Sequence, residues 1–436
     1  MRRLGQHTIW RFRRYPFYLL LCAVSGCLLL FLAGLDLPNG MLQARINYNI
    51  EQSVPLFVKE GLYPNLLSRG DMISTQADNW SETIILQSSM YMNSKEDPLA
   101  IFNNAWIHDN NILQGFIRAS EGEAPNSSYY RYWQGFRVLI RPLLAMFDYS
   151  AIRELFRFFG WFLFCLTAMV LYRSTGGMFT LIFCASLLWT GYGVVTTSIQ
   201  FSLCFFIALL AMILLPQMLK RQYSIAGFFF FVGAATQFFD FYTVPCVTLG
   251  LPLVYFIELK KREPICCQSV LASVMGCVAA WFGAYAGMWI CRMALVSLFL
   301  HIDAFSSTFN SLFRWTGIVE EATYAWIGPL DAIGRAFQTA FTKAHTALLL
   351  GSFLVYAMFL VRAILRHHAR KPDWMFLPVA LIPIVWMIAA SKPTTWHIFF
   401  QYRSLVVFLF ACGAFAVSML EMKTMRYPDM LVDSEL

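Results

Sequence analysis

Charged side chains are scarce in this chain. Asp, Glu, Lys and Arg together make up 13% of its 436 residues, whereas a soluble domain usually has about 25%. The apolar share is 58%, and the apolar residues lie in runs of the length that crosses lipid, about 20 residues. This composition excludes a disordered tail, a secreted disulfide scaffold and a soluble nucleic-acid binder. The net charge of +8 comes from residues between the apolar runs, where membrane topology explains it.

Cysteine is missing from the longest polar stretch, residues 36–150, so no disulfide framework is expected there. The 11 cysteines lie in or beside apolar runs and lack metal-binding spacing. The chain also has no Walker A loop, no GxGxxG after a strand, no HExxH and no GxSxG. We therefore assign no metal ligands and no cofactor, and leave open whether a divalent cation takes part.

Ten apolar runs predict ten transmembrane helices. The first, residues 17–35, follows a basic segment and has no small-residue cleavage site, so we expect it to be retained. The other nine are residues 155–172, 177–193, 198–216, 223–239, 241–258, 268–299, 340–365, 374–390 and 403–420. None shows the alternating polarity of barrel strands, so the expected fold is an all-α polytopic membrane protein.

Lysine and arginine gather in alternate loops, which places those loops and both termini in the cytoplasm. The predicted organisation is a cytoplasmic basic segment 1–16, a first span 17–35, an extracytoplasmic loop 36–150, spans two to seven in 151–299, a second extracytoplasmic loop 300–338, spans eight to ten in 339–422 and a cytoplasmic end 423–436. In the first loop, Met41–Phe57 and Trp80–Tyr91 have helical apolar spacing. We expect these two helices to be amphipathic and to lie flat on the membrane surface.

Unexplained charges gather on the extracytoplasmic side, where an enzyme that acts on a lipid-linked substrate would need them. A transporter instead keeps charges near the middle of the bilayer. Asp78 and Glu82 are four residues apart, so on a helix they share a face. Removal from water raises the pKa of a carboxylate towards the range of a general base. The alternative is a solvated helix start with Asp78 as its N-cap, and Asp71 is a competing base.

Three arginines, Arg131, Arg137 and Arg141, precede the second span among tyrosines and a tryptophan. Guanidinium groups bind phosphate oxygens in a bidentate manner, so these residues are candidate phosphate ligands. The alternative is an interfacial belt that contacts lipid headgroups. Arg141, which precedes a proline, is the most structural of the three in this interpretation.

Asp240 lies between phenylalanines in a tight turn that joins two spans. An unpaired carboxylate there is costly, about 2.5–3.5 kcal/mol on insertion scales. We therefore expect a partner for Asp240, either Arg403 or His397, and the alternative is a purely structural ion pair or helix cap. His397 is also a candidate proton carrier. His108 belongs to the same extracytoplasmic group of ionisable residues.

The segments DNWSETIIL, YYRYWQGFRVLIRPLL, QFFDFYTVPCVTLGLPL and TTWHIFFQYR, and the layout of one span followed by a long loop, resemble the GT-C superfamily of integral-membrane glycosyltransferases, in particular an uncharacterised bacterial branch. The resemblance implies a bacterial inner-membrane enzyme that takes a sugar from a polyprenyl-phosphate donor and transfers it, with inversion, to a cell-envelope glycan or lipid. Asp78, with Glu82 or Asp71 as substitutes, would be the base. Arg131, Arg137 or Arg403 would hold the donor phosphate, with Asp240, His397 and His108 in support.

Two other functions remain open at the sequence level. One is a glycan polymerase or ligase that uses a lipid-pyrophosphate donor at the same face. The other is a transporter or flippase for the same lipid-linked sugars. All three have membrane lipids as partners and none involves nucleic acid.

Overall fold

The structure is a computed structural model that describes residues 14–36, 40–66, 73–261, 267–315, 328–366 and 370–420. Within these ranges the chain is mostly helical, and the one sheet they contain has two short antiparallel strands, β1 (Ala105–Trp106) and β2 (Ser127–Ser128). The predicted all-α fold is confirmed. Apolar runs fold as helices because a helix satisfies its own backbone hydrogen bonds without water.

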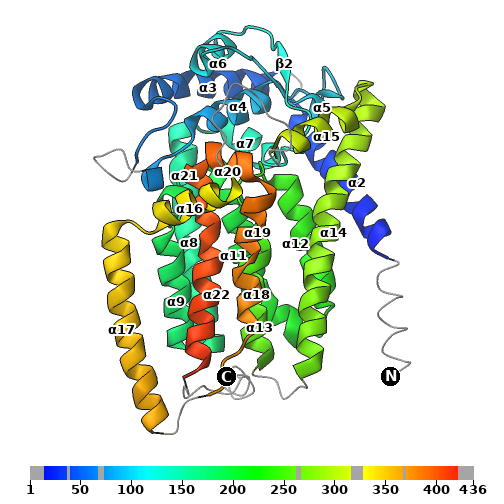
Figure 1. The fold of residues 1–436 in the computed structure, drawn as a ribbon. Helices are drawn as coiled ribbons and strands as arrows, with labels where there is room; N and C mark the ends of the chain where they lie inside the picture. The colour runs from blue at the N-terminus through cyan, green and yellow to red at the C-terminus, as the bar shows by residue number, and fades with distance from the viewer. Residues whose placement is uncertain are drawn as a thin grey trace, which may run out of the picture.

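The larger part of the molecule is a bundle of long apolar helices (Figure 1). Its members are α2 (Tyr15–Gly34), α8 (Tyr149–Thr175), α9 (Gly177–Trp189), α11 (Ile199–Lys220), α12 (Ile225–Phe239), α13 (Cys246–Lys261), α14 (Cys267–Leu300), α17 (Lys343–Leu365), α18 (Phe376–Ala380), α19 (Ile382–Ala389) and α22 (Leu405–Ser418). Each of the ten predicted apolar runs overlaps a member of this bundle, with the ninth run divided between α18 and α19.

Five helical stretches are long and apolar enough to cross a membrane by length and composition. They are Tyr15–Gly34, Tyr149–Thr175, Ile199–Lys220, Val270–Leu300 and Ile398–Ser418. The apolar stretches Gly177–Trp189, Ile225–Phe239, Leu350–Leu365 and Phe376–Ala389 are shorter. The chain is therefore a membrane-embedded helical protein.

A smaller part of the molecule, which we call the cap, covers one end of the bundle (Figure 1). Besides the sheet, the cap contains α3 (Met41–Glu60), η1 (Ile73–Thr75), α4 (Asn79–Met90), α5 (Ala100–Asn103), α6 (Ile112–Ser120) and α7 (Arg137–Leu144). The predicted helices in this region exist, but the expected surface position of Trp80–Tyr91 is wrong. Every residue of α4 except Trp80 is buried, because α4 packs among α3, α6 and α7.

Short elements lie between the cap and the bundle, at a level that we call the rim (Figure 1). They are α10 (Tyr192–Val195), α15 (Ala304–Trp315), α16 (Pro329–Ala340), α20 (Ser391–Trp396), α21 (Ile398–Gln401) and η2 (Tyr402–Ser404). In Figure 1, α16 runs across the direction of the bundle helices rather than along it.

Close helix packing in the bundle depends on small residues. A Cβ atom on Gly233 of α12 would lie 2.3 Å from the carbonyl oxygen of Trp281 in α14. Small residues let helix backbones approach in this way where lipid gives no hydrophobic drive for association. The outcome is a rigid α12–α14 pair, whose cap-facing ends carry part of the candidate site.

Candidate functional site

Asp78 begins helix α4 at the junction of cap and bundle. Its Oδ1 accepts a hydrogen bond from the backbone N–H of Ser81 (3.0 Å) and its Oδ2 accepts one from the Ser81 hydroxyl (2.7 Å). Asp78 is therefore the N-cap of α4, but it is buried, with 2% of its surface exposed, rather than solvated. Burial raises the pKa of Asp78 to about 6, because the loss of hydration outweighs the hydrogen bonds from Ser81.

Glu82, one turn further along α4, has both carboxylate oxygens occupied. Its Oε2 accepts from the Tyr149 hydroxyl (2.9 Å), and its Oε1 accepts from the Ser198 hydroxyl (2.6 Å) and the Gln200 backbone N–H (2.9 Å). Burial raises the pKa of Glu82, and these three hydrogen bonds oppose that rise. Glu82 thus joins the cap to the first turns of α8 and α11.

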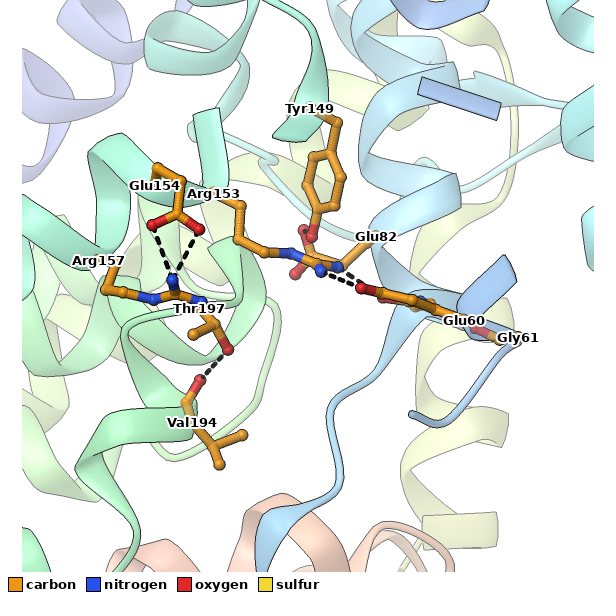
Figure 2. Close-up of polar contacts among 10 residues, drawn as sticks. Glu60, Gly61, Glu82, Tyr149, Arg153, Glu154, Arg157, Val194 and Thr197 are labelled. Carbon is orange, nitrogen blue, oxygen red and sulfur yellow. Dashed lines mark hydrogen bonds and ion pairs between the residues drawn. The ribbon is translucent and has the colours of Figure 1, made fainter. Parts of the chain in front are cut away.

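An ion pair beside Glu82 completes this junction (Figure 2). Nη1 of Arg153 in α8 lies 2.7 Å from Oε1 of Glu60, the last residue of α3. Asn79 donates to the same carboxylate through Nδ2 (3.0 Å) and accepts from Arg153 through Oδ1 (3.2 Å). The arrangement is a polar network that holds α3, α4 and α8 together. Glu82 accepts from three residues on other elements, whereas both oxygens of Asp78 accept from Ser81 of its own helix. Asp71 lies outside the described residues.

The predicted phosphate ligands lie in different places. Arg137 is fully buried and donates to the carbonyl oxygens of Gln134 (3.3 Å) and Ile101 (2.9 Å). Arg403 is also buried and donates to the carbonyl oxygen of Ser74 (3.2 Å). Arg131 is only partly buried, and it is the most accessible of these three arginines.

Arg131 and Arg141 also donate hydrogen bonds within the protein. Arg131 donates to the hydroxyl of Ser311 in α15. Arg141 donates to the carbonyl oxygen of Ser89 (2.8 Å) and to Oε1 of Gln43 (2.7 Å). Arg141 thus has the structural position that its sequence context predicts.

The contacts described for the two candidate histidines are with residues other than Asp78. The imidazole of His397 stacks on Phe400 with 5.0 Å between ring centroids, and burial lowers the pKa of His397 to about 4, so this side chain is neutral at pH 7. His108 is exposed at the end of β1, where its backbone exchanges hydrogen bonds with the side chain of Asn126.

Asp240 ends helix α12 and is 2% exposed. Its Oδ1 accepts from the backbone N–H (3.1 Å) and the hydroxyl (2.6 Å) of Thr243, while its Oδ2 is buried and has no hydrogen-bond partner among the described residues. The expected pairing with Arg403 or His397 is wrong. Arg403 is held instead by main-chain carbonyls, and a turn hydroxyl takes the place of a cation beside Asp240.

A group of aromatic residues connects the two buried aspartates. Tyr129 and Tyr132 stack on each other (4.9 Å between ring centroids) and both stack on Phe241 (5.5 and 5.0 Å). Burial raises the pKa of Tyr129, and the charge of Asp78 adds to this rise. Tyr242, two residues after Asp240, meets Tyr132 edge to face at 4.9 Å between ring centroids. We call Asp78, Asp240 and these tyrosines the carboxylate–tyrosine site.

Two further features mark this site as more than packing. Tyr242 has φ = 58°, in the left-handed region that side-chain-bearing residues rarely adopt. Such strain tends to persist at functional positions. In addition, the hydroxyl of Tyr285 and Oε1 of Gln237 are buried and have no hydrogen-bond partner within the described ranges. Native proteins leave few buried polar atoms unpaired, so these atoms, with Oδ2 of Asp240, are candidate contacts for a polar ligand.

Sequence reasoning missed Arg292, the one charged residue in the apolar helix α14. Its guanidinium donates to the carbonyl oxygens of Tyr130 (3.0 Å), Ile101 (3.3 Å) and Phe102 (2.7 Å). An ionisable residue inside an apolar run indicates a partnered or functional position, and this rule identifies Arg292 from the sequence. Arg292 holds the segment that carries Tyr129 and Tyr132 against α14.

Replacing Arg292 with Met should lower the stability of the protein by about 1–3 kcal/mol, because buried carbonyl groups of the cap lose their donors. Thermal unfolding in detergent measures this effect. An unchanged unfolding temperature would contradict the assigned role of Arg292.

A divalent-cation site does not emerge from the part of the chain that the structure describes, where no group of three or more His, Cys, Asp or Glu side chains is placed to hold a metal ion. The carboxylate–tyrosine site has two carboxylates that are separated by aromatic rings. Whether a divalent cation takes part therefore stays an open question, as in the sequence analysis.

No family model matches this chain, and no curated protein and no solved structure matches it. The GT-C resemblance accordingly depends on the layout and the short segments quoted above. Three of these segments supply residues of the carboxylate–tyrosine site: DNWSETIIL supplies Asp78, QFFDFYTVPCVTLGLPL supplies Asp240 and Tyr242, and YYRYWQGFRVLIRPLL supplies Tyr129 and Tyr132. Function must be argued from this site.

Proposed function

We propose that the chain is a GT-C-like protein with ten membrane spans and an extracytoplasmic cap, situated in a bacterial inner membrane. Five helical stretches have the length and composition of spans, and the shorter apolar helices of the bundle supply the others. Helices α8, α11, α13 and α17 run away from the cap (Figure 1), and their last turns carry Arg173, Lys220, Lys260 with Lys261, and Arg362. Positive charge at that end supports a cytoplasmic location for it.

The proposed activity is transfer of a sugar from a polyprenyl-phosphate donor to a cell-envelope glycan or lipid. The observation that carries it is Asp78, a buried carboxylate with a pKa of about 6 at the junction of cap and bundle. A base with this pKa is ionised at neutral pH and still has an appreciable proton affinity. Asp78 would take the proton of the acceptor hydroxyl as the hydroxyl oxygen attacks the anomeric carbon.

The other bond changes follow from inverting displacement. As the new glycosidic bond forms, the bond between the anomeric carbon and the phosphate oxygen breaks, and the phosphate leaves with the electron pair. Of the three predicted phosphate ligands Arg131, Arg137 and Arg403, Arg131 is the least buried and would be the one to offset the growing negative charge of that phosphate. The Oδ2 of Asp240, which has no hydrogen-bond partner among the described residues, would accept a sugar hydroxyl, and the partly buried ring of Tyr129 would contact the apolar side of a pyranose ring.

Two alternatives use the same scaffold. A glycan polymerase or ligase would differ only in a lipid-pyrophosphate donor and would meet the same site. A transporter or flippase would need exposed charge in the bilayer interior. Arg292 is the charge that best fits that demand, but its donors are occupied by cap carbonyls, which favours the enzyme.

The decisive test is to assay purified protein in liposomes against a panel of polyprenyl-phosphate sugars and glycan or lipid acceptors. We expect transfer from at least one donor, with release of polyprenyl phosphate. Release of pyrophosphate-linked lipid instead would select the polymerase or ligase. Movement of the lipid-linked sugar across the bilayer without any bond change would overturn the enzyme proposal.

The pH dependence should follow the ionisation of Asp78. Transfer should rise by about tenfold per pH unit below pH 6 and level off above it, because only the carboxylate acts as a base. The contribution of Asp78 to stability has the opposite trend. It is fully present below the ordinary pKa of 3.8 and is lost as the pH rises through about 6, because the folded protein binds this proton more tightly than the unfolded chain does. Initial rates and unfolding temperatures between pH 4 and 8 would show both, and a rate that does not change with pH would contradict the assignment.

A further inference from the structure

A half-open groove of about 480 Å³ lies at the rim, and no role has been assigned to it so far. Arg335, Gln338 and Thr339 of α16 line one side, and Ser74 of η1 and Ile398 of α21 line the other. We call it the α16 groove. Most of its lining side chains are polar, with several hydroxyl or amide donors and one guanidinium.

The charge in the groove is positive. Arg335 is exposed and forms no ion pair within the ranges that the structure describes. Asp331, one turn earlier on α16, does not line the groove. Behind the Ser74 wall, Arg403 donates to the carbonyl oxygen of Ser74 (3.2 Å). A groove with one free guanidinium, a second cation behind its wall and no carboxylate suits an anion, and guanidinium and hydroxyl donors suit phosphate oxygens.

The location of the groove indicates where that anion comes from. Helix α16 runs across the bundle at the level where cap and bundle meet (Figure 1), and Leu330 in its first turn is 81% exposed. Helices with this orientation and exposed apolar residues lie in the membrane interface. A phosphate at that level is the headgroup of a lipid whose hydrocarbon chain remains in the bilayer.

We propose that the α16 groove binds the phosphate of a membrane-embedded isoprenyl phosphate, with Arg335 as the direct ligand. This inference rests on the proposed function and specifies where the donor lipid docks, with Arg335 rather than the less exposed Arg131 as the arginine that holds the donor phosphate. Ser74 and Asp78 are separated by four residues, which span at most about 14 Å when fully extended. A phosphate at Ser74 therefore lies within reach of a sugar that is being transferred near Asp78.

The test measures binding of farnesyl phosphate, a short isoprenyl monophosphate, to the full-length protein in nanodiscs without any sugar donor. Arg335→Gln should weaken binding at least tenfold, since it removes the charge but keeps amide donors. Gln338→Glu, which adds a negative charge to the groove, should weaken it as well. The matched control is Arg157→Gln. Arg157, whose side chain is 41% exposed, pairs with Glu154 on α8 (2.7 Å) outside the groove, and its loss should leave binding unchanged.

The possible outcomes separate the sources of phosphate and the two proposals. If inorganic phosphate displaces bound farnesyl phosphate as well as unlabelled farnesyl phosphate does, the groove binds a free anion, and the lipid assignment is wrong. If Arg335→Gln binds normally, or Arg157→Gln weakens binding equally, the groove itself is wrong. Binding that depends on Arg335 in a protein without transfer activity would sustain the groove and reject glycosyl transfer. If the protein transfers sugar and Arg335→Gln changes neither the donor KM nor farnesyl phosphate binding, glycosyl transfer stands and the α16 groove is rejected as the phosphate site.

Discussion

Replacing Asp78 with Asn should lower the rate of sugar transfer by about 10²–10⁴-fold, the usual contribution of a general base. The substitution removes the proton acceptor and leaves the fold in place, because Asn is as good an N-cap as Asp. Its side-chain oxygen can still accept from the backbone N–H of Ser81, as Oδ1 of Asp78 does at 3.0 Å. Initial rates at saturating donor, measured beside the thermal unfolding temperature, separate the loss of chemistry from the loss of structure.

The chain offers a matched control for this variant. Asp148 caps α8 in the same manner, accepting from the backbone N–H of Ala151 (2.9 Å), and belongs to no candidate site. Asp148→Asn should therefore transfer sugar at the rate of the unmodified protein. Full activity in Asp78→Asn would remove Asp78 from the role of base. An equal loss in both variants would show that the assay reports on helix capping.

Much of the fold follows from the sequence because lipid imposes simple rules. The run Ile225–Phe239 consists mainly of Phe, Ala and Gly. In lipid the N–H and C=O groups of its backbone can form hydrogen bonds only with each other, so the run must be helical. The N-cap role of Asp78 was also predictable, because capping depends on residues three positions away. The bundle and the start of α4 were thus accessible to local reasoning.

The burial of α4 was not accessible in this way. Its sequence NWSETIILQSSM combines apolar spacing with many polar residues, a pattern that normally indicates a helix with one face in contact with water. In the folded cap these polar groups find internal partners: Gln87 accepts from the backbone N–H of Ile107 (2.9 Å), and Ser89 donates to the carbonyl oxygen of Ile85 (2.8 Å). Such partners come from tertiary packing and leave no trace in the local pattern.

The arginines show the same limitation for the candidate site. Arg137 and Arg403 were predicted to hold phosphate because guanidinium groups suit that anion. Their partners are main-chain carbonyl oxygens, such as that of Ile101 for Arg137, and a carbonyl group is present at every residue. Sequence reasoning can identify a side chain that needs a partner, but it cannot distinguish a ligand from a distant stretch of backbone.

Replacing Glu82 with Ala should destabilise the protein by about 3–5 kcal/mol, the range measured when one member of a buried charged network is removed. The substitution leaves the hydroxyls of Tyr149 and Ser198 and the backbone N–H of Gln200 without their acceptor. It also leaves Arg153 with one carboxylate fewer in its surroundings. Thermal unfolding in detergent should show a large fall in unfolding temperature, accompanied by loosening of the cap from α8 and α11.

Glu82→Gln distinguishes a structural role from a catalytic one. The amide keeps an oxygen that can accept from Ser198 and Gln200, so this variant should be clearly more stable than Glu82→Ala. If Glu82 only holds the junction, transfer per folded molecule in Glu82→Gln should stay close to that of the unmodified protein, in contrast to Asp78→Asn. A catalytic loss of about 10²-fold or more in a folded Glu82→Gln protein would instead make Glu82 the base, because the isosteric amide preserves the packing and removes only the ability to take a proton.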